Sequence, residues 1–351
     1  ATTVLAAVAL LAACGTQAVH ERPEVPTPAA YKEAAAATAS GVWRPAQPGG
    51  AVSEAWWTLY GDATLNQLQQ QAAIDNQNIA LSVARLRAAQ AAVAGSSAGQ
   101  LPSVGASASS GRTRSGSSLA DGSSTARIST SHALGLNASW ELDLWGRVGG
   151  AVAAARASAQ ASAADLAAMR LSVQATVAQT YFALRAAESQ ARLLGDTLAA
   201  YERSWELTRN RQKAGVASAA DAAQAEAQYK STQVQWLESE TSRAQLEHAL
   251  AALVGQVPAA FSLPATAELP QPPAVPAQLP SQLLERRPDI AAAERRVAAA
   301  NAQIGVAQAA FFPAVTLSGA AGYRGAQLSG LLNAPQLFWS LGPALAVSLL
   351  D

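Results

Sequence analysis

The side chains in this sequence that could do chemistry are three histidines, one cysteine and one pair of neighbouring carboxylates. His20, His132 and His248 lie in segments of different character, and none has a second metal ligand at helical spacing. Glu141 and Asp143 are a carboxylate pair on one face of an expected strand, and a polar strand face explains them better than acid–base catalysis. The sequence also lacks a glycine-rich phosphate-binding loop. We therefore expect a protein that is not an enzyme and binds no metal.

Cys14 is the only cysteine in the sequence, so an internal disulfide is excluded. It follows the apolar stretch 1–13, which is typical of a secretory signal and too short to span a bilayer. The Leu-Ala-Ala-Cys sequence resembles the bacterial lipobox, which implies that Cys14 carries a covalent diacylglycerol and an N-acyl lipid. Gly15 follows, where the lipobox pattern would have Asp for inner-membrane retention, and this implies the outer membrane. A buried cysteine in an apolar helix is the alternative.

Composition argues against a nucleic-acid partner and predicts an extended N-terminal segment. The chain carries 24 basic and 24 acidic residues, so a nucleic-acid partner is not expected. The proline-rich stretch 14–61 predicts an extended, lipidated N-terminal arm. Its Trp56 and Trp57 fit a membrane-interface belt and a clamp onto the protein body equally well. Because the chain lacks an initiator Met and ends inside a strand-like run, we expect a fragment clipped at both ends.

The elements that must position these residues are organised around residues 147–254, which we expect to form a long helical hairpin. Residues 150–214 contain no proline, and about 65 helical residues would give a rod of about 95 Å. Apolar residues recur about every 3.5 positions, which predicts coiled-coil contacts. One seam contains Leu166, Val173, Thr180, Ala187, Leu194 and Tyr201, and the other contains Val177, Leu184, Ala191, Leu198 and Trp205. Gly215 provides the turn, and Ser218 is expected to cap the return helix with Asp221.

A tandem duplication accounts for the segments on either side of this hairpin. Residues 62–100 and 288–311 are each expected to form a helix that precedes a strand pattern. Arg85 precedes Pro102 by 17 residues, and Arg296 precedes Pro313 by 17. Other pairs match at the same offset of 211 residues: Ile79 with Ile290, Val104 with Val315, Ser107 with Ser318 and Gly111 with Gly322. Residues 255–287 predict a proline-rich connector with a short helix.

Residues 101–146 and 312–351 are each expected to form a β-hairpin, with the Ser/Gly-rich stretch 112–130 as a loop. Residues 134–144 alternate strictly between apolar and polar, which is typical of a transmembrane β-strand, although a half-buried strand of a soluble sandwich has the same period. Two hairpins do not make a stable sheet alone, so we expect several subunits to share one barrel. The predicted lumen-facing residues are Asn137, Ser139, Glu141 and Asp143, and the predicted lipid-facing residues are Leu136, Trp140 and Leu142.

Several motifs together resemble the TolC family of outer-membrane efflux lipoproteins, in the OprM/NodT-like subgroup that serves RND-type drug pumps. They are Leu-Ala-Ala-Cys ending at Cys14, Trp-Thr-Leu-Tyr-Gly-Asp at 57–62, Trp-Glu-Leu-Asp-Leu-Trp-Gly at 140–146, Ala-Gly-Val-Ala-Ser at 214–218, Arg-Pro-Asp-Ile at 287–290 and Phe-Pro at 312–313. These motifs occur in order along the chain. The departure from the family is that the second repeat stops where its own long helices would begin.

The resemblance implies a mainly α-helical fold with a transmembrane β part. Long antiparallel coiled-coil helices would form a periplasmic α-barrel, joined to an outer-membrane β-barrel shared by a homotrimer. The implied function is the exit duct of a tripartite efflux pump for drugs or other small molecules. Its partners would be a periplasmic adaptor (membrane fusion) protein, an inner-membrane RND pump and outer-membrane lipid. The adaptor would dock at the hairpin tip, on Gly215, Val216, Ala217 and Ser218.

Two alternative functions stay open. A type I protein-secretion outlet of the same family would have the same architecture, although the lipobox and the Trp-rich arm resemble the drug-efflux subgroup more closely. A structural coiled-coil lipoprotein without a pore would explain the helices but not the alternating strands.

Overall fold

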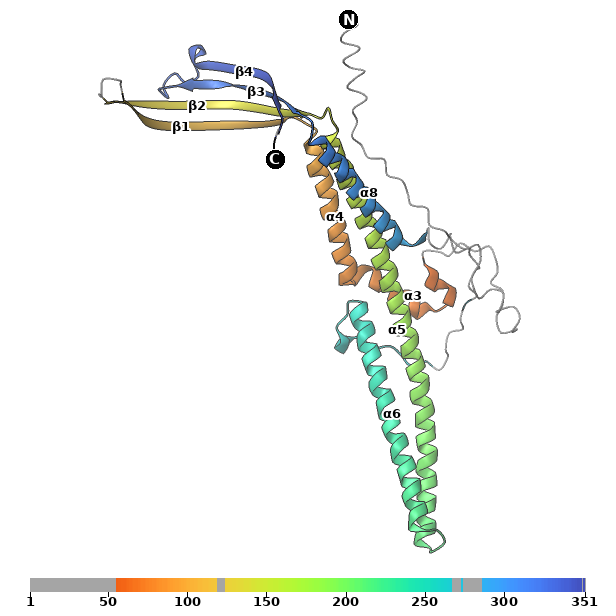
Figure 1. Cartoon of the computed structure of the whole chain (residues 1–351). Coiled ribbons are helices and arrows are strands. Elements are labelled where there is room, and N and C mark those ends of the chain that lie inside the picture. The colour runs from red at the N-terminus through yellow and green to blue at the C-terminus, as the bar shows by residue number, and fades with distance from the viewer. Residues whose placement is uncertain (1–54, 119–123, 267–272, 274–285, 349, 351) are drawn as a thin grey trace, which may run out of the picture. The chain divides into compact units, whose positions relative to one another are not determined.

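The computed structural model describes residues 55–118, 124–266, 273, 286–348 and 350 (Figure 1). Cys14 and the rest of the chain up to residue 54 lie outside the described residues, and so does much of the expected connector 255–287. The described chain divides into two compact units. The sheet unit lies within Leu86–Ala163 and Ala291–Asp351, and the helical unit lies within Val25–Arg85 and Ala164–Ile290.

A four-stranded antiparallel sheet is the main feature of the sheet unit (Figure 1). Its strands are β1 (Ser103–Ser118), β2 (Ser124–Leu142), β3 (Ala314–Gly325) and β4 (Leu337–Ala346), in the order β1-β2-β3-β4. The short 3-10 helix η3 (Ala334–Gln336) precedes β4. The central pairing, β2 with β3, joins the hairpins of the two repeats into one sheet, and it runs from His132↔Gly325 to Leu142↔Val315.

The β1–β2 hairpin is longer than the sequence predicts. The prediction that residues 112–130 form a loop is wrong, because the two strands stay paired from Arg112↔Thr130 as far as Ser118↔Ser124. Serine and glycine are common in loops, which is why the sequence pattern was misleading. In an antiparallel pair the backbone hydrogen bonds hold the strands together, and they do not require apolar side chains.

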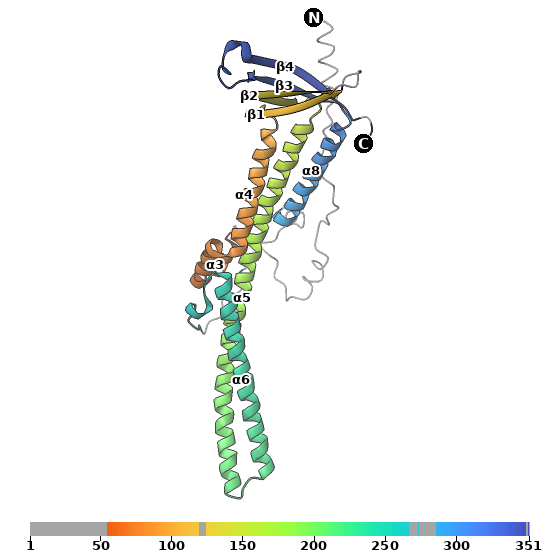
Figure 2. The same cartoon turned by 90° about the vertical axis from the view of Figure 1, so that its left-hand side faces the viewer.

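The duplication is visible in where the helices end and the strands begin. Helix α4 (Gln77–Ala98) ends 211 residues before the end of α8 (Pro288–Ala309), and β1 begins 211 residues before β3. Within the sheet unit, both helices lie beside the start of the long helix α5 (Arg147–Lys213), as Figure 2 shows. Glycine allows this close packing, because a Cβ atom at Gly150 would lie 3.0 Å from Cγ2 of Val306 on α8.

Two antiparallel helices, α5 and α6 (Ala219–Leu253), dominate the helical unit (Figure 1). Shorter elements are η1 (Trp56–Tyr60), α3 (Ala63–Asp75) and η2 (Pro258–Ala260). The predicted seams are buried over the middle of α5, at Leu166, Val173, Val177, Leu184 and Ala191. Tyr201, closer to the turn, is 36% exposed. The predicted seam positions are therefore buried between residues 166 and 191, and burial is less complete toward the turn.

Residues 62–100 form two helices, not the single helix that the sequence predicts. Helices α3 and α4 are separated by Asn76, whose backbone is extended with φ −71° and ψ 120°. Its side-chain oxygen accepts a hydrogen bond from the N–H of Asn78 at 3.0 Å, and its Nδ2 donates to the carbonyl of Leu253 at 2.8 Å. Asn76 therefore caps α4 and also satisfies a carbonyl at the end of α6, which a continuous helix could not do.

Candidate functional site

The register of the strands gives the sheet two chemically different faces. Side chains directly opposite each other in neighbouring strands lie on the same face. Leu136 of β2 is opposite Ala106 of β1 and Ala321 of β3, and Ala321 is opposite Trp339 of β4. The alternation predicted from one strand therefore extends across all four described strands.

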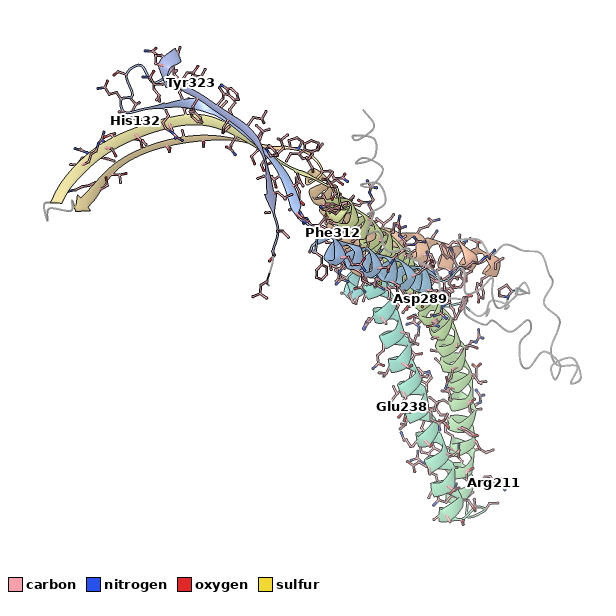
Figure 3. All side chains as sticks on the ribbon, turned by 45° about the horizontal axis from the view of Figure 1, so that its top comes forward. His132, Arg211, Glu238, Asp289, Phe312 and Tyr323 are labelled. Carbon is pink, nitrogen blue, oxygen red and sulfur yellow. The ribbon has the colours of Figure 1, made fainter. Side chains whose placement is uncertain are left out.

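The apolar face of the sheet is large and uncovered within the described chain. It comprises Val104, Ala106 and Ala108 of β1, Leu134, Leu136, Ala138, Trp140 and Leu142 of β2, Val315, Leu317, Gly319, Ala321 and Tyr323 of β3, and Leu337, Trp339, Leu341, Pro343 and Leu345 of β4. Figure 3 draws these side chains along the strands. Leu136 is 59% exposed, Leu341 69% and Trp339 76%. Exposed apolar patches of this extent mark contact with lipid or with another protein.

The polar face carries small or hydrophilic side chains. It comprises Ser103, Gly105 and Ser107 of β1, Asn137, Ser139 and Glu141 of β2, Thr316, Ser318 and Ala320 of β3, and Ser340, Gly342 and Ala344 of β4. Three of the predicted lumen residues, Asn137, Ser139 and Glu141, thus share one face. Glu141 accepts a hydrogen bond from Nε of Arg147 at 2.8 Å, and this hydrogen bond raises the pKa of Arg147.

Asp143 does not continue the polar face, contrary to the sequence prediction. Strand β2 ends at Leu142, and α5 begins at Arg147. The Asp143 carboxylate accepts hydrogen bonds from the backbone N–H groups of Val148 at 2.9 Å and Gly149 at 2.6 Å. These N–H groups have no partner inside the helix, so a carboxylate ahead of the first turn stabilises it. Asp143 therefore caps α5, the longest of the described helices.

An aromatic residue on the polar face was not found from the sequence. A Cβ atom at Gly322 would lie 2.2 Å from the carbonyl oxygen of Leu134, so only glycine fits between β2 and β3. Phe338, opposite Gly322, reaches to 3.6 Å from the Cβ position of Gly135. The guanidinium of Arg324 lies 5.0 Å from the centre of the Phe338 ring, a cation–π contact. The repeat match of Gly322 with Gly111 was the one sequence signal at this site.

The turn between α5 and α6 brings the four predicted docking residues together. Gly215 has φ of 75°, a left-handed conformation that favours glycine. The N–H groups of Val216 and Ala217 donate to the carbonyl of Arg211, at 2.9 and 3.3 Å, and close the last turn of α5. Val216 is 68% exposed. The tip therefore presents its backbone and small side chains to solvent.

Ser218 caps α6 as predicted. The Ser218 Oγ accepts a hydrogen bond from the N–H of Asp221 at 3.1 Å, and Asp221 Oδ2 accepts one from the N–H of Ser218 at 3.0 Å. Hydrogen bonds from the Ser218 side chain and backbone lower the pKa of Asp221. The charged carboxylate then complements the N-terminal end of the helix dipole. The tip has a fixed backbone on both sides.

A buried ionic cluster in the helical unit was also missed. Arg185 donates from Nη1 to Glu188 and to the carbonyl of Pro264, both at 2.8 Å, and Arg243 lies 3.4 Å from Glu188. Burial alone would lower the pKa of Arg185, but its hydrogen bonds to Glu188 and Tyr181 raise it overall. Each buried charge has an opposite charge beside it, so this cluster fastens the chain near Pro264 onto α5. Charged residues within an apolar repeat gave no sequence signal of burial.

Within the part of the chain that the structure describes, no group of three or more His, Cys, Asp and Glu side chains is arranged to hold a metal ion. No described helix is both long enough and apolar enough to cross a membrane.

Comparison with known proteins identifies the family. The outer membrane efflux protein family matches residues 68–256 and 279–351. The probable efflux pump outer membrane protein TtgC of Pseudomonas putida is 31% identical over 340 residues, covering 96% of this chain and 69% of that protein. Outer membrane protein OprJ of Pseudomonas aeruginosa is 31% identical over 347 residues, covering 97% of this chain and 70% of that protein. The solved outer-membrane channel OprN aligns with a TM-score of 0.83 and 30% identity, covering 95% of this chain and 73% of that chain. By sequence and by fold, the chain belongs to the outer membrane efflux protein family.

Proposed function

We propose that this chain is the outer-membrane channel subunit of a tripartite efflux pump and forms a homotrimeric exit duct for drugs or other small molecules. The observation that carries the proposal is the four-stranded sheet with one apolar and one polar face. In a closed barrel, the apolar face would meet lipid, and the polar face would line a water-filled lumen. Asn137, Ser139 and Glu141 are the proposed lumen-facing residues of β2.

The sheet is too small to close on itself, which supports a trimer. A closed barrel needs about eight strands or more, because fewer strands leave no room for the side chains inside. This sheet has four strands. Three copies would supply twelve strands. Because all pairs in the order β1-β2-β3-β4 are antiparallel, β4 runs opposite to β1. The edge strand β4 of one copy could therefore pair with β1 of the next copy and leave no open edge.

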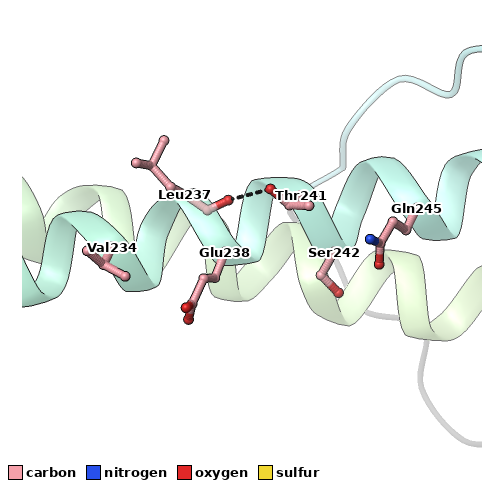
Figure 4. Close-up of a pocket in the computed structure, with 6 residues that line it drawn as sticks. All are labelled: Val234, Leu237, Glu238, Thr241, Ser242 and Gln245. Atoms are coloured by element: carbon pink, nitrogen blue, oxygen red, sulfur yellow. Dashed lines mark hydrogen bonds between the residues drawn. The ribbon is translucent and has the colours of Figure 1, made fainter.

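The surface of the helical hairpin supports the proposal that several hairpins form a tunnel wall on the periplasmic side. Figure 4 shows one stretch of α6 that bears Val234, Leu237, Glu238, Thr241, Ser242 and Gln245. Val234 is 53% exposed and Leu237 is 52% exposed. Exposed apolar side chains at helical spacing favour packing against another helix, as an α-barrel of several hairpins would provide.

Two partners follow from the proposed duct. Relatives such as TtgC are named as outer membrane proteins of efflux pumps, and a pump in the inner membrane requires a connection across the periplasm. A periplasmic adaptor would make that connection at the hairpin tip, on Gly215, Val216, Ala217 and Ser218. The inner-membrane partner would be an RND-type pump, in accord with the subgroup that the sequence motifs resemble.

Pore formation is the first expected result. The purified trimer inserted into planar lipid bilayers should produce discrete conductance steps, because a lumen lined by the polar face would hold water and ions. Single-channel recording measures this directly. Protein that inserts as a trimer but never conducts would support the alternative, a structural coiled-coil lipoprotein, and would contradict the proposed duct.

Lipidation of Cys14 is the second expected result. The mature N-terminus should begin at Cys14 and carry a diacylglycerol and an N-acyl chain, because two or more acyl chains give stable anchoring where one is marginal. Mass spectrometry of the N-terminal peptide measures the added mass. A Cys14→Ala variant should lose the lipid and also keep its apolar leader. An unmodified Cys14 in wild-type protein isolated from outer membranes would rule out this anchor.

A further inference from the structure

The β1–β2 hairpin carries arginines where the apolar face ends. Strand β3 ends at Gly325, opposite His132 (labelled in Figure 3), so β1 and β2 pair only with each other from Gly111↔Ser131 outward. Arg112 and Arg114 lie on this two-stranded extension, and both side chains are exposed. They belong to the part of the sheet farthest along the strands from α5.

The register assigns both arginines to the same face as the apolar side chains. Arg112 is opposite Thr130, and Arg114 is opposite Ile128, in phase with Val104, Ala106 and Ala108. From Trp140 to Thr130, β2 advances about 33 Å along the strand, or about 25 Å in height at the tilt of a barrel strand. The lipid-facing band of transmembrane barrels is about 25 Å tall. Arg112 therefore lies at the edge of the band that is farther from the helices.

Nothing in the described hairpin neutralises these two charges. The side chains of Arg112 and Arg114 make no hydrogen bond or ion pair with another described residue of the hairpin. Residues 103–118 and 124–140 contain no Asp or Glu, and Asp121 lies outside the described residues. Two exposed cations at the edge of a lipid-facing surface would be stabilised by anionic groups at the membrane surface.

We propose that Arg112 and Arg114 bind the phosphate groups of a lipid A-type glycolipid in the outer leaflet of the outer membrane. The two residues are two positions apart on one strand face, about 7 Å, so both guanidinium groups can reach one phosphate or two neighbouring phosphates. Arginine presents a planar fork of donors that matches phosphate oxygens. The site rests on the proposed function, because it requires the apolar face to meet lipid and the hairpin end to face the cell exterior.

Arg127 distinguishes this site from a general attraction between positive charge and anions. It is exposed and lies on the same two-stranded extension, opposite Ser115. Its register puts it on the polar face, in phase with Asn137 and Ser139. In the proposed barrel it would therefore face the lumen and could not reach a lipid phosphate.

Lipid binding by the intact trimer tests the proposal. The trimer in detergent would be titrated with bisphosphoryl lipid A and, separately, with the same lipid A after removal of its phosphates, by native mass spectrometry. The paired substitution Arg112→Gln and Arg114→Gln should weaken binding of the bisphosphoryl form about 30-fold, since each arginine near an anionic surface contributes about 1 kcal/mol. Arg127→Gln should bind like the wild type. The dephosphorylated lipid should bind wild type and paired variant equally weakly.

Three outcomes would overturn the site: undiminished binding by the paired variant, an equal loss in Arg127→Gln, or equal binding of the two lipids by the wild type. If the paired variant fails to assemble, Arg112→Lys with Arg114→Lys retains the charges and removes the fork, and should weaken binding several-fold. Single-channel conductance of the same preparations separates this question from the proposed function. A conducting trimer without phosphate-dependent lipid binding refutes the site alone.

Discussion

Replacing Val216 or Ala217 by Glu is expected to abolish drug efflux while the trimer still folds and conducts. Both residues lie in the turn between α5 and α6, and Val216 is 68% exposed, so neither substitution removes a buried contact. The turn is held by Gly215 and by the capping pair of Ser218 and Asp221, which the substitutions leave in place. A negative side chain there would instead obstruct close approach of a partner's backbone and add an unpaired charge to the contact.

The expected loss is large because each tip contact is small. A turn buries little area, so the affinity of an adaptor would come from simultaneous contacts at several tips related by symmetry. A substitution present in every copy weakens all of these contacts at once. The measurements are drug susceptibility of cells carrying the variants and cross-linking between the tip and the adaptor.

Val257 provides a matched control for the tip. Like Val216, it is 68% exposed, and it precedes η2, away from the turn. Val257→Glu should leave efflux and cross-linking at the wild-type level, because it adds the same charge at a site without a proposed partner. If Val216→Glu and Ala217→Glu cells pump drugs normally, the tip is only a turn and the adaptor docks elsewhere.

A lysine at Ala321 is expected to destabilise the inserted protein by about 2–4 kcal/mol more than a lysine at Ala320. The two alanines are neighbours on β3, but Ala321 is opposite Leu136 on the apolar face and Ala320 is opposite Asn137 on the polar face. A charge near the middle of the bilayer is costly, whereas a charge in a water-filled lumen remains hydrated. Urea unfolding of the two variants from lipid vesicles gives the difference in free energy.

The pair Ala138 and Ser139 on β2 should give the same sign with a smaller difference. Ala138 lies next to Trp140, closer to the end of the apolar band, and the cost of a charge decreases toward the interface. Equal stability of the Ala320→Lys and Ala321→Lys variants would contradict the assignment of the two faces to lumen and lipid.

Features that depend on local sequence patterns or on a sequence repeat could be predicted from the sequence. The helical hairpin, its turn at Gly215 and the cap at Ser218 follow from helix propensity, spacing and turn chemistry, which are local properties. The duplication was detectable because one constant offset aligns Arg85 with Arg296 and Pro102 with Pro313. The alternation of apolar and polar residues on β2 predicted the two faces of the whole sheet, because side chains opposite each other in neighbouring strands lie on the same face.

Features that depend on tertiary partners could not be predicted in the same way. The break at Asn76 depends on a hydrogen bond to Leu253, which is distant in sequence. Asp143 follows Glu141 at the two-residue spacing of the polar face, but its carboxylate accepts hydrogen bonds from the first backbone N–H groups of α5. The burial of Arg185 depends on Glu188 and on the carbonyl of Pro264, and neither relation is visible in a pattern of apolar residues.

The pairing of β2 with β3 also determines the order in which the sheet can be built. His132 and Gly325 are 193 residues apart, so β2 is synthesised well before its partner strand exists. The entropy cost of closing this loop is only slightly larger than that of a shorter loop, because the cost grows with the logarithm of loop length. Pairing between strands so distant in sequence is nevertheless slow. During this interval the nascent β1–β2 hairpin exposes both an apolar face and an unpaired edge, the combination that promotes aggregation between chains. The edge of β2 is therefore closed only when the second repeat arrives, and aggregation competes with folding until then.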